Sequence, residues 1–406
     1  MVFGHEPPSI RRLLRSKGLR RLRKAMESLP EPKQIGKVRH PTWRCLLIIL
    51  LSLTSGRGWV LDAHSFAARH GRQLGKLFGE GYSTPSYCTL VRALHGIGPE
   101  CRELTESMGF ATGGSEGCQM DGKLVRATRA GASPNSALDI IELTLGSGMA
   151  DFESCGPGGK ERSEIRAMET LVRRNAKGLR KLAVPLTIDA IAANSRMTSL
   201  LHSLGIPFCI CIKNEGKGLG EAIRTDFLDK AGSIAPLRAT RKSGGRVDER
   251  EFYFAEDPSW AWRIYGARPW KGVAHLGMVR RKSTNLRTGE TEEQVRYYLL
   301  SEGIDAKGFR EARSRHWSIE SSHWVIDNSF REDRHRLGQK DRPAALAMGI
   351  LRRKAFEEIR SCLRPGMDFA KARRELSAEG FRETLYVLSG KAARASSKIA
   401  GNDQKR

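Results

Sequence analysis

The 406-residue sequence has no apolar run long enough to cross a membrane. Its longest such run, residues 45–51, falls well short of the roughly 20 residues that a membrane-spanning helix needs. The basic N-terminal stretch is not followed by an apolar segment and small residues, so it does not match a secretory signal. These absences predict a cytosolic protein with no membrane partner.

Paired cysteines are also missing. None of the eight cysteines forms a CxxC pair, and only Cys209 and Cys211 lie close together, in an apolar run. Reduced and mostly buried thiols are therefore favoured over a disulfide framework or a zinc site.

Acidic residues are scarce relative to basic ones. The sequence has 45 Asp and Glu against 70 Lys and Arg, a formal net charge of +25. This excess suits a polyanionic partner better than a small neutral ligand, which leaves nucleic acid or an anionic membrane surface. The chain is also too long for one small core, so a catalytic domain with accessory pieces is expected.

The N-terminal part has helical patterns. Residues 9–27 combine basic and apolar residues at helical spacing and predict an amphipathic basic helix. This helix could contact DNA directly. It could equally be a solvated helix face or a frayed tail. Residues 41–54, 59–70 and 85–95 predict further helices. A Gly-rich stretch follows, so residues 1–112 are predicted to form a helical, DNA-binding domain.

From residue 113 the pattern becomes mixed α/β. A meander of three strands is predicted at 118–125, 138–145 and 149–153. A helix, a strand, a second helix and a second strand follow at 163–178, 182–188, 195–204 and 208–212. This order predicts a mixed sheet with βαβ crossovers, as the first part of a catalytic domain that ends at residue 217.

Residues 218–302 interrupt that order. Short strand candidates at 250–254, 275–279 and 296–300 predict an inserted β-rich subdomain. A helix at about 308–328 begins the second part of the catalytic domain, residues 303–362. A helix predicted at about 343–362 ends this part, and a helix at about 368–388 follows it. Residues 363–406 are predicted to form a helical C-terminal region with a basic, disordered tail from residue 391.

Two aspartates occupy positions where a carboxylate needs an explanation. Asp121 lies inside the first strand, in QMDGKLV, where a charge costs free energy unless something compensates it. Asp189 ends the apolar strand of VPLTIDA, and ligands collect at the carboxyl ends of strands in open α/β sheets. Mg²⁺ takes oxygen ligands and keeps several waters, so two or three carboxylates would suffice. Spacing alone leaves capping or turn roles open.

These residues and the segment RHWSIESSHWVIDNSFRED resemble the insertion-sequence transposases of the H-repeat-associated group. The resemblance covers most of the chain. In the N-terminal part it rests on PTWRCLLIILLSLTSGRGW and TPSYCTLVRAL, and in the catalytic part on MDGKLVR, KERSEI, LTIDA, IKN, SGGRVDER, YYLLS and HWSIE, in that order. It implies an RNase H-like mixed sheet with an inserted β-rich subdomain, preceded by a helical N-terminal domain.

The resemblance also implies a DDE transposase whose three acidic residues fall on Asp121, Asp189 and Glu320. These would be the catalytic residues and the ligands of two Mg²⁺ ions, for which Mn²⁺ can substitute. The implied reaction is metal-dependent cleavage at the terminal inverted repeats of an element, followed by strand transfer into target DNA. The implied partners are double-stranded DNA and further copies of the chain, in a dimer or higher oligomer at the bacterial nucleoid.

Basic residues beside these motifs are candidates for phosphate contacts. The candidates are Lys123, Arg126, Lys213, Arg246, His316 and His323. A solvated surface role is an equal alternative for the lysines and arginines, and a structural role for the histidines. Asp327 and residues 332–333 are predicted to be ion-pair partners.

Tryptophans recur in two places. Trp317 and Trp324 are seven residues apart, which favours core packing on one helix face. Packing is also favoured over base stacking for Trp260, Trp262 and Trp270.

Relative to the family, one residue is missing between Glu320 and the next His-Trp pair. Because one residue turns a helix by about 100°, either the helix is locally irregular or the residues from His323 to Asp327 face differently. Two other function classes were considered. A decayed transposase that only binds DNA remains an alternative, and the ordered motifs argue against a host nuclease or resolvase with the same fold.

Overall fold

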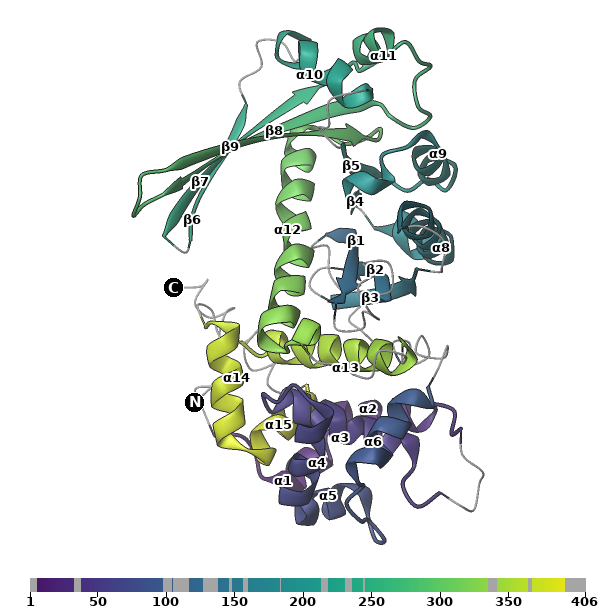
Figure 1. The fold of residues 1–406 in the computed structure, drawn as a ribbon, viewed down its shortest axis with the longest axis vertical. Helices are drawn as coiled ribbons and strands as arrows, with labels where there is room; N and C mark the ends of the chain where they lie inside the picture. The colour runs from purple at the N-terminus through teal and green to yellow at the C-terminus, as the bar shows by residue number, and fades with distance from the viewer. Residues whose placement is uncertain are drawn as a thin grey trace.

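The computed structural model describes residues 6–32, 38–97, 104, 117–126, 138–145, 148–155, 160–182, 184–212, 218–230, 236–243, 245–334, 342–363 and 367–390. Figure 1 shows a body of helices at one end, a long sheet at the other, and helix α12 standing against the sheet. None of the described helices is long and apolar enough to pass through a bilayer. The predicted tail, from residue 391, lies outside the described residues.

The helical body begins with six short helices. These are α1 (Ile10–Leu14), α2 (Lys17–Glu27), α3 (Thr42–Thr54), α4 (Val60–Arg69), α5 (Gly71–Phe78) and α6 (Tyr87–His95). Helix α3 is apolar on every side, as expected of a helix surrounded by others. The predicted basic helix forms α1 and α2, whose Leu13, Leu19 and Met26 are buried. It is a docked element, so the frayed-tail alternative is excluded.

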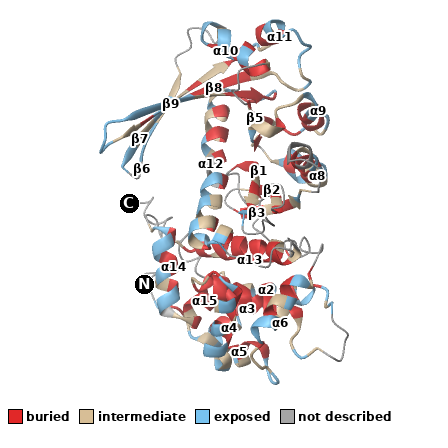
Figure 2. Cartoon of the chain, viewed as in Figure 1, coloured by how far each residue is buried: buried red, intermediate tan, exposed pale blue. Residues whose placement is uncertain are grey.

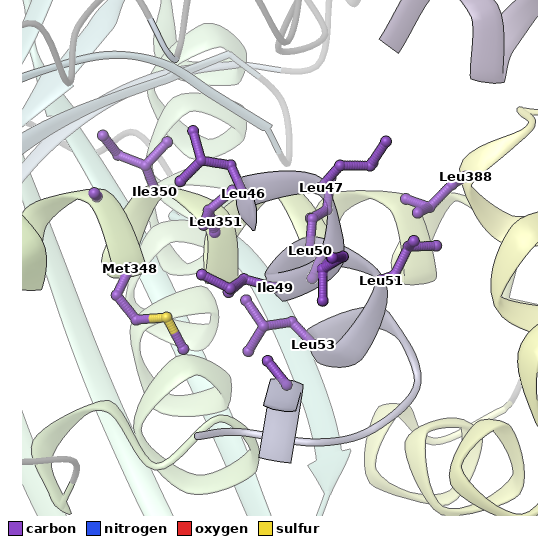
Figure 3. Packing of buried hydrophobic residues seen from close by; sticks show 14 of the residues in the cluster. Leu46, Leu47, Ile49, Leu50, Leu51, Leu53, Met348, Ile350, Leu351 and Leu388 are labelled. Atoms are coloured by element: carbon purple, nitrogen blue, oxygen red, sulfur yellow. The ribbon is translucent and has the colours of Figure 1, made fainter. Parts of the chain in front are cut away.

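The last helices of the chain complete this body. They are α13 (Arg342–Ser361), α14 (Phe369–Glu379) and α15 (Phe381–Leu388). Figure 3 shows Met348 and Leu351 of α13 and Leu388 of α15 beside the leucines of α3. A single helix was predicted over 368–388, but Gly380 adopts a φ of 103° that ends α14. The segments predicted as separate N-terminal and C-terminal regions thus share one hydrophobic core.

The mixed sheet begins as predicted. Its first elements are β1 (Cys118–Val125), β2 (Leu138–Leu145), β3 (Gly148–Ser154), α8 (Lys160–Lys181), β4 (Leu186–Ile188), α9 (Ser195–Ser203) and β5 (Phe208–Ile212). Strands β1, β2 and β3 pair antiparallel, whereas β4 pairs parallel with both β1 and β5. Helices α8 and α9 cover one face of this part of the sheet and α12 lies against the other (Figure 1).

The insertion is β-rich, but its strands continue the same sheet. It contains α10 (Leu219–Lys230), β6 (Leu237–Ser243), β7 (Arg246–Ala255), α11 (Ser259–Tyr265), β8 (His275–Asn285) and β9 (Thr291–Leu300). Strand β9 pairs antiparallel with β5, giving a nine-stranded order β3-β2-β1-β4-β5-β9-β8-β7-β6 in the described residues. The predicted strands were too short because the outer halves of β8 and β9 are polar, and that of β9 is also exposed (Figure 2).

Helix α12 (Ala306–Ser329) positions everything that follows. Asp305 caps it, accepting a hydrogen bond from the Gly308 N–H at 2.6 Å. Near this end the helix lies so close to β8 that a Cβ on Gly277 would come within 2.5 Å of the Phe309 ring. The helix then continues without interruption across residues 321–323. The predicted alternative of a local irregularity is therefore excluded.

The cysteines follow the prediction. None of the seven described cysteines forms a disulfide with another described cysteine, and Cys45, Cys118, Cys209 and Cys362 are buried. Burial raises the pKa of both Cys118 and Cys209 to about 12, so these thiols stay protonated and unreactive.

Candidate active site

Asp121 and Asp189 lie at the same level of two neighbouring parallel strands. Gln119 pairs with Thr187 and Met120 with Ile188. Asp121 is the next residue of β1, and Asp189 directly follows the last residue of β4 with an extended backbone. Side chains alternate along a strand, so Asp121 lies on the face of Gln119 and Asp189 on the face of Thr187. Thr187 faces α12, because its Oγ1 lies 2.8 Å from His316 Nδ1. Both aspartates therefore face α12.

Successive residues on one face of α12 contact successive residues of β1 and β4. His316 lies at the level of Thr187, and His323 Nδ1 lies 3.5 Å from Asp121 Oδ2. Further along, Asp327 accepts a hydrogen bond from Lys123 Nζ at 2.7 Å. Glu320 is one turn after His316 and one turn before His323, on the same helix face. The helix thus presents Glu320 toward the ends of β1 and β4.

The surroundings of Asp121 leave its charge only partly compensated. Burial raises the pKa of Asp121 to about 6, and the negative charges of Asp189 and Glu320 add to this rise, while His323 and the Gly122 N–H oppose it. The Gly122 N–H donates to Asp121 Oδ1 at 2.8 Å, so both carboxylate oxygens have a neighbour. Asp189 and Glu320 are therefore both near enough to Asp121 for their charges to raise its pKa.

The site partly fits the metal that the sequence resemblance implied. Among the described side chains, no three of His, Cys, Asp and Glu lie close enough together to hold one ion. Mg²⁺ needs only one or two carboxylates because it keeps several waters, and Asp121 and Asp189 supply oxygen ligands at a place with uncompensated negative charge. The oxygen donors of the two aspartates are of the type that Mg²⁺ prefers, and the ligand roles of Asp121, Asp189 and Glu320 all stay predictions.

Known proteins resemble the chain over most of its length. It is 23% identical over 366 residues to Putative transposase YncI of Escherichia coli O157:H7, covering 82% of this chain and 86% of that protein. It is 24% identical over 335 residues to H repeat-associated putative transposase YhhI of Escherichia coli strain K12, covering 78% and 84%. The chain is thus similar over most of its length to proteins named as putative transposases, one of them H repeat-associated.

Two further comparisons add little. No protein-family model matches the chain. Among solved structures, a piggyBac transposase synaptic complex with hairpin DNA aligns with 95% of this chain and 80% of its own, at 11% identity and a TM-score of 0.38. A likeness this weak assigns no fold to the chain.

Beneath Asp121, the structure contains a chain of ion pairs of which the sequence predicted only the carboxylates of Asp327 and Glu332. His323 Nε2 lies 3.5 Å from Glu142 Oε2, and Arg353 Nε donates to Glu142 Oε1 at 2.7 Å. Arg353 Nη1 also donates to Glu332 Oε1 at 2.9 Å. Lys123 Nζ lies 3.8 Å from Glu332 Oε2 and bonds Asp327. We call this set the buried ion network; it comprises Lys123, Glu142, His323, Asp327, Glu332 and Arg353.

Glu142 is the residue of this network that a sequence signal could have revealed. It pairs with Asp121 across β1 and β2, and it lies in the apolar strand LDIIELTL, the same anomaly that drew attention to Asp121. Burial acts to raise the pKa of Glu142, but the charges and hydrogen bonds of Arg353 and His323 outweigh it and lower the pKa well below its usual range. Glu142 therefore remains ionised beside the site.

Two predicted phosphate contacts are corrected by burial. The Lys123 side chain is only 5% exposed and is neutralised by Asp327 and Glu332, so it holds α12 to β1 instead of facing solvent. His316 is buried against Thr187, and this burial together with nearby Arg313 lowers its pKa to about 3. A neutral, enclosed imidazole cannot neutralise a phosphate. His323 lies between Asp121 and Glu142, which gives it a structural contact as well.

The remaining phosphate candidates keep their predicted exposure. The Arg126 side chain is 72% exposed, with its Nε 3.8 Å from Asp333 Oδ2. Arg246 is exposed at the start of β7, in the turn after β6. Lys213 lies outside the described residues. Asp327, Glu332 and Asp333 form ion pairs as predicted, but their partners are Lys123, Arg353 and Arg126 instead of the neighbouring arginines of the sequence.

The packing prediction is confirmed for the tryptophans of the insertion and is wrong for Trp324. Trp260 and Trp262 are buried in the core beneath β8 and β9, with Trp270 packed against them, so packing is confirmed there. Trp324 is 65% exposed, and its predicted core position was wrong. The seven-residue interval gives the correct helix face, but no element of the described structure covers that face at Trp324. The side chain of Trp317 is outside the described residues.

Proposed function

We propose that the chain is a metal-dependent DDE transposase that binds the terminal inverted repeats of its own element, cleaves a phosphodiester at each end and joins the freed 3′ hydroxyl to target DNA. The relatives are named as transposases, and the charge of +25 suits a DNA partner. Three antiparallel strands followed by two parallel ones support the RNase H-like interpretation of the sheet.

One observation carries the proposal. Asp121 and Asp189 follow the last paired residues of adjacent parallel strands, and Glu320 reaches the same site from α12. Three carboxylates gathered against their mutual repulsion cost free energy in the folded protein. Such an arrangement is expected where bound cations offset that cost.

The chain's own residues would set the geometry of the reaction. Asp121 and Asp189 would hold Mg²⁺, which when bound supplies activation of the attacking oxygen and stabilisation of the leaving one. His323 and the Gly122 N–H orient the Asp121 carboxylate, and the His316–Thr187 hydrogen bond fastens α12 one turn before Glu320. Hydrolysis and strand transfer are both in-line displacements at phosphorus, so the same rigid frame would serve both.

The test is cleavage of DNA that carries the ends of the element encoding the chain, with Mg²⁺ or Mn²⁺, mapped strand by strand. The wild type is expected to cut at the element boundary, and Asp121→Asn, Asp189→Asn and Glu320→Gln should each lose cleavage and strand transfer while retaining DNA binding. Their losses should not add, because residues that act as a unit fail together. Asp229→Asn, an exposed carboxylate on α10, is the matched control and should cut normally.

The outcomes separate the competing functions. Specific binding of the ends without cutting would support a decayed, DNA-binding descendant instead. Normal cutting by Glu320→Gln would remove the third carboxylate from the proposal. Cutting at sites unrelated to the ends would point to a nuclease of another kind.

A further inference from the structure

An arginine-lined cavity lies between the outer strands of the sheet and α12. It has a volume of about 270 Å³. Four arginines line it together with Ser314 and Glu320, namely Arg250 of β7, Arg281 of β8, Arg296 of β9 and Arg313 of α12. We call it the arginine cavity. None of these four arginines was a candidate in the sequence, and the cavity shares Glu320 with the proposed active site.

The strands place these cations together in an unusual way. Arg250 pairs directly with Arg281 across β7 and β8, and Val279 pairs with Arg296 across β8 and β9. Like charges directly opposite each other destabilise a sheet. Burial lowers the pKa of Arg250 to about 10, and the positive charges of Arg281 and Arg313 contribute to this effect although Asp248 opposes it. The cations are therefore crowded in the folded chain.

Nearby carboxylates compensate this charge only in part. Asp248 Oδ1 accepts from Arg281 Nη2 at 2.7 Å, and Asp248 Oδ2 lies 3.5 Å from Arg250 Nη2. Among the residues that line the cavity, the four arginines face a single carboxylate, that of Glu320. A concave surface of one sign concentrates counter-ions of the other sign.

The opposite face of the same strands provides a contrast. Strand residues alternate between faces, so Arg280 and Lys282 line a second cavity together with Arg238, Glu249, Glu251 and Glu293. There Arg238, Arg250, Arg280 and Lys282 face three glutamates, and two of these cations form ion pairs, Arg280 with Glu293 and Arg238 with Glu251, each at 3.2 Å. The excess of cations over carboxylates in the lining is therefore larger on the face that looks toward α12.

We propose that the arginine cavity binds a backbone phosphate of the DNA strand on which Glu320 acts. Guanidinium groups match phosphate oxygens in a two-pronged geometry, and an anion would relieve the crowding of the four cations. The cavity is smaller than the roughly 300–1,000 Å³ of sites for drug-sized ligands, which suits a phosphate group better than a whole cofactor. The inference rests on the proposed function, because it identifies where the strand is held beside the catalytic carboxylates.

The experiment measures DNA affinity by fluorescence anisotropy in EDTA, with a labelled 20-base-pair duplex and a 20-nucleotide single strand of arbitrary sequence. Phosphate contacts carry no sequence information, so no element end is required. The test variant is the double substitution Arg281→Gln, Arg296→Gln. The matched control is Arg280→Gln, Lys282→Gln, which removes the same charge from the other face of the sheet. Circular dichroism confirms that each variant is folded.

The test variant should lose about tenfold or more in affinity, as expected for lost hydrogen bonds to a charged group. Its plot of log affinity against log salt should become shallower by about one for each lost phosphate contact. The control variant should keep most of the wild-type affinity and most of the wild-type salt slope. A third variant, Arg281→Lys, Arg296→Lys, keeps the charge without the planar geometry and should weaken binding while keeping the salt slope.

Equal losses in the test variant and the control would overturn the proposal. So would displacement of the DNA by millimolar inorganic phosphate at constant ionic strength, which would mark a site for the free anion. Since no metal and no cleavage are involved, a negative result leaves the catalytic proposal standing. Conversely, normal cleavage by Asp121→Asn would refute the catalytic proposal and leave the measured phosphate contact intact.

Discussion

The buried ion network and the arginine cavity flank the same stretch of α12 and use the same kinds of side chain in opposite ways. In the network, Arg353 is shared by Glu142 and Glu332, and Lys123 by Asp327 and Glu332. Arg352 lies 3.7 Å from Glu332, so three cations face three carboxylates inside the protein. In the cavity, cations exceed carboxylates and open to solvent. Matched buried charge fixes the position of elements, whereas unmatched charge at a surface is available to a ligand.

Glu320 and Asp121 lie where these two regions meet. Asp121 contacts the network through His323, and Glu320 lines the cavity. The proposed active site therefore has a rigid side, which orients the carboxylates, and an open positive side, which can receive a polyanion. The following substitutions test that division, beginning with the largest expected effect.

Replacing Arg353 with Met should break the network. It would leave Glu142 and Glu332 buried without their shared cation, and removal of one partner from a buried ion pair costs about 3–5 kcal/mol. Urea unfolding measures the loss. The control is Arg280→Gln, whose partner Glu293 is half exposed, and which should change the free energy of unfolding by less than about 1 kcal/mol. Similar values for the two variants would contradict the contrast drawn here.

Replacing Asp121 with Asn should stabilise the metal-free protein at pH 7. The folded state raises the pKa of Asp121 from 3.8 to about 6, so it favours the protonated acid and is penalised when the carboxylate ionises. The shift corresponds to roughly 2–3 kcal/mol at about 1.4 kcal/mol per unit. The gain should be fully present above pH 6, shrink as the pH falls, and vanish below about pH 4.

Added Mg²⁺ sharpens the same measurement. It should raise the thermal midpoint of the wild type and leave Asp121→Asn nearly unchanged, because an ion that binds only the native state stabilises it. A variant that is less stable than the wild type at pH 7 without metal would show that the Asp121 charge is already compensated in the fold.

Replacing Arg296 with Gln should hardly affect stability. The residue lines the arginine cavity among other cations, so its loss removes repulsion as well as packing, and the free energy of unfolding should change by less than about 1 kcal/mol. Thermal unfolding at low and high salt checks this expectation. A loss comparable to that of Arg353→Met would mean that the cavity is part of the structural frame.

Replacing Trp324 with Ala should have the smallest effect on stability, within about 0.5 kcal/mol, because its side chain is 65% exposed. Trp262→Ala, a fully buried counterpart, should cost about 3–5 kcal/mol by the same measurement. A large loss at Trp324 would show that this face of α12 is covered in solution.

The sequence predicted those parts of the site that follow from local pattern. A carboxylate inside an apolar strand is visible in QMDGKLV and TIDA, and strand order brings those two aspartates together. Glu320 came only from the family resemblance. The network could not be predicted, because Glu142 and Arg353 are 211 residues apart and no local signal relates them. The arginine cavity could not be predicted for a similar reason, because its four arginines come from separate elements that meet only after the sheet curls around α12.

The same distinction explains the fold. Apolar strands β1, β4 and β5 and the helices around them were predicted because burial leaves a clear periodicity. The insertion was predicted as a separate subdomain, although β9 joins β5. Pairing between strands that are distant in sequence leaves no periodic trace, so only the structure could reveal one continuous sheet.

The packing of α13 and α15 onto α3 has a consequence for synthesis of the chain. Helices α1–α6 emerge from the ribosome long before their partners, since about 245 residues separate Ile97 from Arg342. At a translation rate of about 5–20 residues per second, roughly 12–50 s pass before α13 and α15 are synthesised and can pack onto the leucine-rich surface of α3. During that interval the nascent chain exposes its most apolar helix, so products truncated before α13 should be targets for chaperones and proteases.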